Sequence, residues 1–216
     1  MTLKIVQLGE PVLRQKARPL SRGEIRSQPV QQLIDWMRET MRDAPGVGLA
    51  APQVGLSLRI AVIEDSPESM RGLSPERLAE HERSPVPFHV VVNPRIRLSG
   101  PGVEFFEGCL SMPGYSALVS RSRAARVDCL NHRGDPVSIR AAGWYARILQ
   151  HEIDHLNGVI YIDRMATRSL ATTDNLTRYW KNRPIEQIRA EFSSVKPSPS
   201  PASSVHGVSQ SPRRKK

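Results

Sequence analysis

The stretch GWYARILQHEIDHLNG constrains the fold of this chain more than any other part of the sequence. Its apolar residues recur at helical spacing, and Gly158 is a typical stop signal after the last turn. On a helix, His151 and His155 lie on one face, one turn apart, in the same stripe as the apolar residues. Both imidazoles then face inward and can bind one metal ion. The stretch therefore predicts a buried helix that contributes two ligands to a metal site.

Glu152 follows the first of the two histidines, where its carboxylate can reach a water on the metal. The competing interpretation is a pair of surface histidines, because the short H-E-x-x-H pattern also arises by chance. Hydrolytic metal sites usually have three protein ligands and one open position. Cys109 is one candidate for the third ligand, because a thiolate suits iron or zinc. Cys129 is the rival, although its place in the alternating stretch ARVDCLN is typical of a small core residue.

Cysteine usage and hydropathy limit the class of protein. Two cysteines in 216 residues do not make a disulfide framework, which favours a reducing compartment. No run of eighteen or more apolar residues is present, so we expect no membrane span. The first residues, MTLKIVQLGEPVLR, lack the basic and apolar regions of a signal peptide. We therefore expect a cytoplasmic protein, with an organellar location left open.

The predicted elements place strands in the middle of the chain and helices towards its ends. Residues 24–46 and 184–192 have helical patterns, and residues 66–87 are a polar excursion. Short strands are predicted in SLRIAVIE, FHVVVNPRIRL, VEFFEGCL, ARVDCLN and PVSIRAA, with HRGD as the turn between the last two. This order favours an α+β fold over an alternating parallel sheet.

The chain divides into a body, residues 1–193, and a tail, residues 194–216. The tail is rich in Pro and Ser and should be disordered. Its charged residues are Lys196, Arg213, Arg214, Lys215 and Lys216. The whole chain carries +10, so the body retains +5. Composition favours a solvated tail over an electrostatic arm for RNA.

A third stretch, GVGLAAPQVG, is glycine-rich without the spacing of a nucleotide-binding loop. Gln53 is its one functional candidate, because a side-chain amide can donate to an oxyanion. On the residues alone, a structural loop with a solvated glutamine is favoured.

Together, GVGLAAPQVG, EGCLS and QHEIDHLNG resemble the three signature motifs of the peptide deformylase family, in its order and spacing. The resemblance covers about residues 4–170. The insertion before FHVVVNP and the run GWYARILQHE look like the branch that also includes plant organellar enzymes. The family fold implied is α+β, with mostly antiparallel strands around a central metal-binding H-E-x-x-H helix.

The resemblance implies a role for each matching residue. The implied metal ligands are Cys109, His151 and His155, so Cys109 would be a ligand and not a nucleophile. Glu152 would be the general base, with the Gln53 amide and the Leu110 backbone N–H stabilising the oxyanion. The implied substrate-binding residues are Val47, Gly48, Glu107, Gly108 and Arg147. From its place one turn before His151, we expect the Arg147 stem to line the methionine site and its head to lie near water. Asp154 would pair with Arg121 and brace the metal helix, the alternative being a solvated pair of little value.

The implied activity is hydrolysis of the N-formyl group from the initiator methionine of a nascent chain, giving formate. The implied metal is ferrous iron, with zinc, nickel or cobalt able to replace it. The substrates are formyl-methionyl nascent peptides, and the ribosome is a candidate partner for the basic tail. Two alternatives stay open: a zinc endopeptidase with a distant third ligand, and an RNA- or ribosome-binding protein with a structural metal. Glu152 discriminates against the second, because a structural site has no need of a carboxylate there.

Overall fold

The computed structural model describes residues 1–44, 46–181 and 183–194. The helices are α1 (Arg22–Arg26), α2 (Gln28–Asp43), α3 (Pro75–Glu80), α4 (Gly143–Leu156), α5 (Thr173–Asn175) and α6 (Ile185–Ser194). The strands are β1 (Gly48–Ala50), β2 (Ile60–Asp65), β3 (Val86–Cys109), β4 (Met112–Leu130), β5 (Pro136–Ala142) and β6 (Ala171–Thr172). Short 3-10 segments are η1 (Pro11–Arg14), η2 (Ala51–Val54), η3 (Pro67–Met70), η4 (Tyr161–Asp163) and η5 (Thr167–Ser169), and η6 (Leu176–Trp180) is a π-helical turn.

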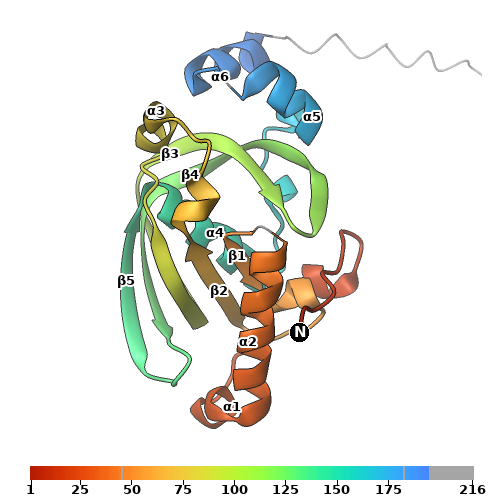
Figure 1. The fold of residues 1–216 in the computed structure, drawn as a ribbon, viewed down its shortest axis with the longest axis vertical. Helices are drawn as coiled ribbons and strands as arrows, with labels where there is room; N and C mark the ends of the chain where they lie inside the picture. Colours follow the sequence, from red (N-terminus) through yellow and green to blue (C-terminus); the bar gives the residue numbers. More distant parts are fainter. Residues whose placement is uncertain (45, 182, 195–216) are drawn as a thin grey trace, which may run out of the picture.

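The strands form one sheet in the order β1-β2-β3-β4-β5, and every neighbouring pair is antiparallel. β6 pairs with β4 at its N-terminal end. The helices α4 and α2 pack on this sheet (Figure 1). The predicted α+β class with mostly antiparallel strands is therefore confirmed.

Strand β2 packs against apolar residues on both faces of the sheet. Ile60 and Val62 belong to the apolar cluster that contains α2, whereas Ile63 packs in the cluster that contains α4. Successive strand residues point to opposite faces, so both faces of β2 need apolar residues. This explains the unbroken run IAVI and places α4, the helix that carries His151 and His155, in the core.

The predicted helix over residues 24–46 is wrong in one respect, because it is two helices. Ser27 has φ −68° and ψ 147°, which ends α1 and starts α2. In a continuous helix the ring of Pro29 would clash with the carbonyl of Ile25, whereas Pro29 fits the first turn of α2. The helical spacing was predicted correctly, and Pro29 is the reason that the helix is interrupted at Ser27.

The polar excursion contains two short helices, η3 and α3. Each begins after a serine, Ser66 and Ser74, whose side chain accepts a hydrogen bond from the third residue on. Neither helix buries a residue, so both lie outside the core as predicted, whereas Val86 at the end of the excursion starts β3 and is buried.

Several boundaries differ from those predicted. β3 is a single long strand with register shifts where two strands were predicted, and β4 begins well before ARVDCLN. The predicted turn HRGD and the C-terminal helix are present. The predicted tail begins at Ser194, the last residue of α6, and from residue 195 it lies outside the described residues.

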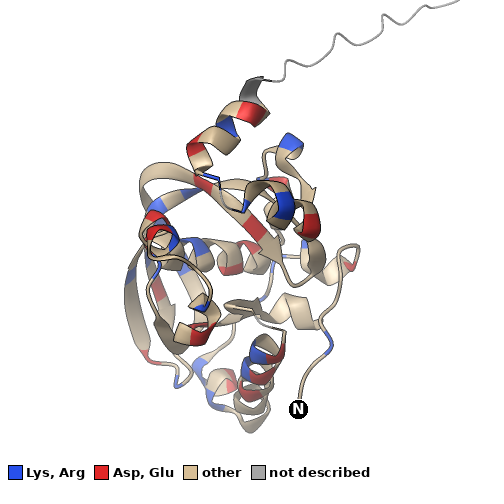
Figure 2. Cartoon of the chain, turned by 45° about the horizontal axis from the view of Figure 1, so that its top comes forward, with Lys and Arg blue, Asp and Glu red and all other residues tan. Residues whose placement is uncertain are grey.

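Charged residues of both signs are interspersed over the outer elements (Figure 2). On α2, for example, acidic and basic residues alternate along the helix, in the order Asp35, Arg38, Glu39 and Arg42. Arg38 pairs with Asp35. Within the part of the chain that is described, no helix has the length and apolar character needed to cross a membrane.

Candidate metal centre and active site

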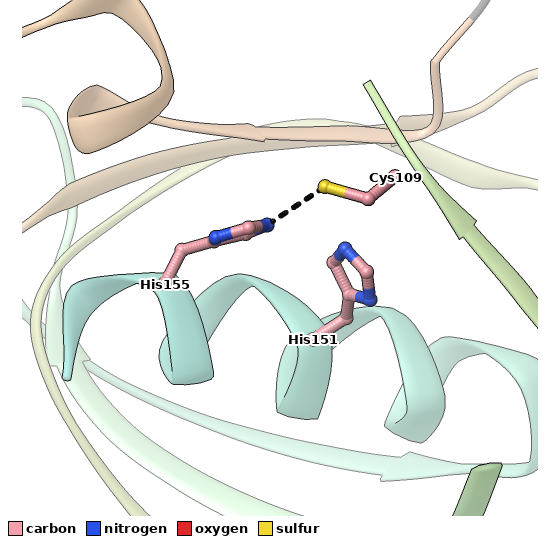
Figure 3. Close-up of side chains that lie close together, drawn as sticks. All are labelled: Cys109, His151 and His155. Carbon is pink, nitrogen blue, oxygen red and sulfur yellow. Dashed lines mark hydrogen bonds between the residues drawn. The ribbon is translucent and has the colours of Figure 1, made fainter. Parts of the chain in front are cut away.

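Three side chains from two elements meet at the centre of the molecule. Cys109 is the last residue of β3, and His151 and His155 lie one turn apart on α4 (Figure 3). The Cys109 Sγ atom is 3.3 Å from His155 Nε2, and one potential ligand atom of each residue lies within 4.8 Å of the others. The chain thus brings one thiol and two imidazoles to a single point, a donor set that suits iron or zinc. Cys129, by contrast, is buried in the apolar cluster beside α4, as expected of a core residue.

The imidazole of His151 is oriented by Glu107. His151 Nδ1 lies 3.1 Å from Glu107 Oε2. A carboxylate only accepts hydrogen bonds, so Nδ1 donates and Nε2 keeps its lone pair for a metal. Burial lowers the pKa of His155 well below its ordinary value, which favours the neutral form that ligates. The residues present therefore fit a divalent metal ion.

Glu152 is buried beside this cluster without a hydrogen-bond partner for Oε2 among the described residues. Burial raises its pKa to about 7. A carboxyl group with that pKa can accept and return a proton near neutral pH. The free oxygen therefore fits a proton carrier better than a structural carboxylate, which would be paired.

Gln53 is buried, which rules out the solvated glutamine that the residues alone favoured. Its Oε1 accepts a hydrogen bond of 2.9 Å from the backbone N–H of Ala50. The other end of the amide must therefore be the NH₂ group, and Nε2 lies 3.5 Å from Cys109 Sγ. The backbone N–H of Leu110 donates to no group among the described residues. Two donors thus lie beside Cys109.

A cavity of about 420 Å³ opens onto the cluster. Most of the predicted site residues line it: Val47, Gly48, Gln53, Glu107, Gly108, Cys109, Leu110, Arg147, His151 and Glu152. The volume is in the range of small-molecule and peptide side-chain sites. Their individual roles stay predictions.

Arg147 lines the cavity, but the expectation that its head lies near water is wrong. The residue is only 4% exposed. Nη1 donates to Glu107 Oε1 at 2.6 Å and to the Val119 carbonyl at 2.9 Å. A buried guanidinium needs such partners, and the carboxylate of Glu107 provides one inside the core.

The predicted pair of Arg121 and Asp154 is present and buried, so the alternative of a solvated pair is wrong. Arg121 also donates to Glu107, at 3.0 and 2.9 Å. Asp154 accepts two further bonds from Arg164, at 2.6 and 2.8 Å. These contacts link the back of α4 to the carboxylate that orients His151.

Among the cavity residues that the sequence analysis did not assign to the site are Trp144, Arg83 and Thr173. Trp144 lies one turn before Ile148 on α4, so helical spacing places it on the face that carries the two histidines. Arg83 comes from the polar excursion, and Thr173 begins α5. No local pattern marks these last two, because only the packing of distant segments brings them to the cavity.

Comparison with known proteins agrees with this geometry. The family model described as polypeptide deformylase matches residues 2–170. Peptide deformylase 1A, chloroplastic/mitochondrial, of Arabidopsis thaliana is 46% identical over 174 residues, covering 80% of this chain and 65% of the relative. The chain thus spans slightly less than two thirds of that plant relative. Peptide deformylase 1 of Streptomyces coelicolor is 44% identical over 182 residues, covering 82% of this chain and 80% of the relative.

A solved structure of class I type b peptide deformylase from Acinetobacter baumannii, bound to Met-Ala-Ser, superposes with a TM-score of 0.68. It is 34% identical, with 76% of this chain and 99% of that chain covered. A peptide deformylase from Synechococcus elongatus, in complex with actinonin, gives a TM-score of 0.64 at 39% identity, with 77% of this chain and 80% of that chain covered. The match over most of the body, together with the Cys-His-His cluster, leads to one conclusion: this chain belongs to the polypeptide deformylase family.

Proposed function

We propose that this chain hydrolyses the N-formyl group from the initiator methionine of nascent polypeptides and releases formate. The observation that carries the proposal is Glu152, a buried carboxylate with one free oxygen beside three potential metal ligands. Family membership and the cavity at the cluster support the same activity.

Cys109, His151 and His155 would hold one divalent ion, which we propose to be Fe²⁺, with Zn²⁺, Ni²⁺ or Co²⁺ as substitutes. When bound, such an ion acts as a Lewis acid and lowers the pKa of water, which makes hydroxide available near neutral pH. The thiolate of Cys109 would serve as a ligand, while the hydrogen bond from His151 Nδ1 to Glu107 holds the first imidazole in place.

Glu152 would take the proton of the attacking water and later give it to the leaving amine. As the formyl carbon becomes tetrahedral, its oxygen gains negative charge. The Gln53 amide and the Leu110 N–H are the nearby donors that would stabilise that charge, and one such donor typically contributes about 3 kcal/mol in the transition state. Val47, Gly48 and Gly108, which line the cavity, would contact the peptide backbone of the substrate.

The test is formate release from formyl-Met-Ala-Ser by protein purified without oxygen and loaded with Fe²⁺. We expect turnover by the parent and its loss in Glu152→Ala at equal metal content. A fully metallated parent without turnover would contradict the proposal and favour a structural metal in an RNA- or ribosome-binding protein. An endopeptidase would instead cleave internal bonds of an unformylated peptide.

We further propose that residues 1–193 form the catalytic domain and that residues 194–216 are a basic, Pro/Ser-rich tail that contacts the ribosome. Deleting the tail should leave turnover of a short formyl-Met peptide unchanged and weaken ribosome co-sedimentation at low salt. Unchanged co-sedimentation would contradict the second proposal without touching the first. Bacterial and organellar relatives both occur among the similar proteins. We propose a cytoplasmic location.

A further inference from the structure

The side chain of Arg83, which comes from the polar excursion, lies at the wall of the cavity. Arg83 Nε and Nη2 donate to the two oxygens of Asp65, each at 2.8 Å. The Asp65 side chain is fully buried and that of Arg83 is 11% exposed. The Arg83 guanidinium also lies over the Trp144 ring, 5.2 Å from its centroid. Two independent contacts therefore fix the orientation of this guanidinium.

The backbone beside Arg83 is fixed against the start of the metal helix. The N–H of Trp144 donates to the His81 carbonyl at 3.0 Å, and the His81 ring stacks on the Trp144 ring. Gly143 has φ +56°, and a Cβ there would lie 2.4 Å from Glu82 Cβ. Only glycine permits this close approach, which joins the end of the excursion to α4. These contacts hold the end of the excursion, and Arg83 with it, against α4.

Arg83 differs from the other charged groups that line the cavity. The guanidinium of Arg147 donates hydrogen bonds to Glu107 and to backbone carbonyls. Glu107 in turn accepts hydrogen bonds from three side chains, those of Arg147, Arg121 and His151. The Nη1 atom of Arg83 donates to no group among the described residues. Arg83 is therefore the arginine at this cavity that keeps an N–H group available for an oxygen of the substrate.

We infer that Arg83 is a specificity-determining residue that binds a carboxylate side chain at the second or third residue of the formyl-methionyl substrate. This inference rests on the proposed function. With the formyl group beside Cys109 and His151, the residues that follow methionine would lie farther along the same cavity, which Arg83 and Trp144 also line. A guanidinium held in advance loses little entropy on binding a carboxylate, and such a charge-assisted bond is stronger than one to a neutral amide.

The experiment compares matched peptides in which only the charge differs. The pairs are formyl-Met-Glu-Ser against formyl-Met-Gln-Ser, and formyl-Met-Ala-Glu against formyl-Met-Ala-Gln, all with an amidated C-terminus. Amidation removes the terminal carboxylate, which Arg83 would otherwise also attract. We expect the parent to show a kcat/KM about tenfold higher for the acidic member of at least one pair, the size of one hydrogen bond to a charged group. High salt should reduce that ratio.

The variant is the double substitution Asp65→Asn with Arg83→Gln. Removing Arg83 alone would leave the buried Asp65 unpaired and destabilise the fold, so both charges are removed together. We expect the acidic preference to fall to near one. Arg71→Gln is the matched control, because Arg71 lies in the same excursion and its side chain is 79% exposed. Its ratio should equal that of the parent.

Two outcomes would overturn the inference: a parent that turns over both members of each pair equally, or a preference that survives the double substitution. Absence of turnover from every formyl peptide, including formyl-Met-Ala-Ser amide, would instead contradict the proposed function itself. The two failures are therefore distinguishable in one set of assays.

Discussion

Gly48 lies so close to Glu152 that a Cβ at position 48 would be 2.3 Å from Glu152 Oε1. The strand β1 therefore passes directly over the carboxylate that we assign as the general base. A methyl group at this position has to push aside either the strand or the carboxylate.

Gly48→Ala should reduce kcat by at least tenfold with unchanged metal content, because a small displacement of a proton carrier is costly. Steady-state kinetics and metal analysis of the purified protein measure both quantities. Gly23→Ala is the control: a Cβ there has ample space on the exposed helix α1. Equal activity of the Gly48→Ala protein and the parent would show that Glu152 does not need its present position.

The two buried cysteines should respond differently to the same substitution. Cys109→Ala should lose most of the bound metal, because two imidazoles remain where three ligands stood. Cys129→Ala should keep the metal and lose only about 1 kcal/mol of stability, as a small core residue does. Metal content per chain after gel filtration separates the two. Retention of the metal by Cys109→Ala would contradict its assignment as a ligand.

Gln53→Ala should lower kcat by about 100- to 1000-fold with little change in KM, the effect of removing one oxyanion donor. The donor assignment follows from the hydrogen bond that Gln53 Oε1 accepts from Ala50. Gln32→Ala, on the exposed side of α2, is the control and should behave like the parent. A change confined to KM would mean that Gln53 binds substrate and transition state alike.

Asp154→Ala should cost about 3–5 kcal/mol of unfolding free energy, because it leaves the buried Arg121 without one of its two carboxylate partners. Asp128→Ala is the control, since that aspartate pairs with arginines at the surface and such pairs contribute about 0–1 kcal/mol. Chemical denaturation of both proteins at equal metal loading measures the difference. Similar losses of unfolding free energy in the two variants would mean that the buried ion pair of Asp154 and Arg121 stabilises the fold no more than a surface pair does.

His81 should make stability depend on pH. Burial, followed by the nearby charge of Arg77, lowers its pKa to about 4 from its ordinary value of 6.5. Between these two pKa values, the unfolded chain binds a proton at His81 and the folded chain does not. The contribution of His81 to the free energy of unfolding is therefore complete above pH 6.5 and is lost as the pH falls towards 4. Between about pH 7 and pH 5 this group should remove about 1–2 kcal/mol.

The measurement is the unfolding free energy of the parent and of His81→Phe at both pH values. Phenylalanine keeps an aromatic ring beside Trp144 and Phe105 but does not titrate. The variant should therefore lose less stability than the parent over this interval. An identical loss in both proteins would contradict a neutral, partly buried His81.

The metal site shows how much the sequence alone could determine. Helical spacing places His151 and His155 on one face of α4, and the H-E-x-x-H pattern points to a metal with an adjacent base, because these relations are local. The alternation in ARVDCLN identifies Cys129 as a core residue. The choice of Cys109 as a ligand came only from family resemblance, since a strand end some forty residues away has no periodic relation to the helix.

Tertiary structure decided what depends on burial and on distant contacts. Gln53 is buried rather than solvated, and the head of Arg147 is paired with Glu107 rather than facing water. Local sequence cannot reveal either, because a polar side chain enters the core only when partners from other elements satisfy it. The same reason applies to Arg83. Asp65 ends β2, and Gly143 and Trp144 begin α4, and only the packing of these two elements against the polar excursion makes Arg83 part of the cavity wall.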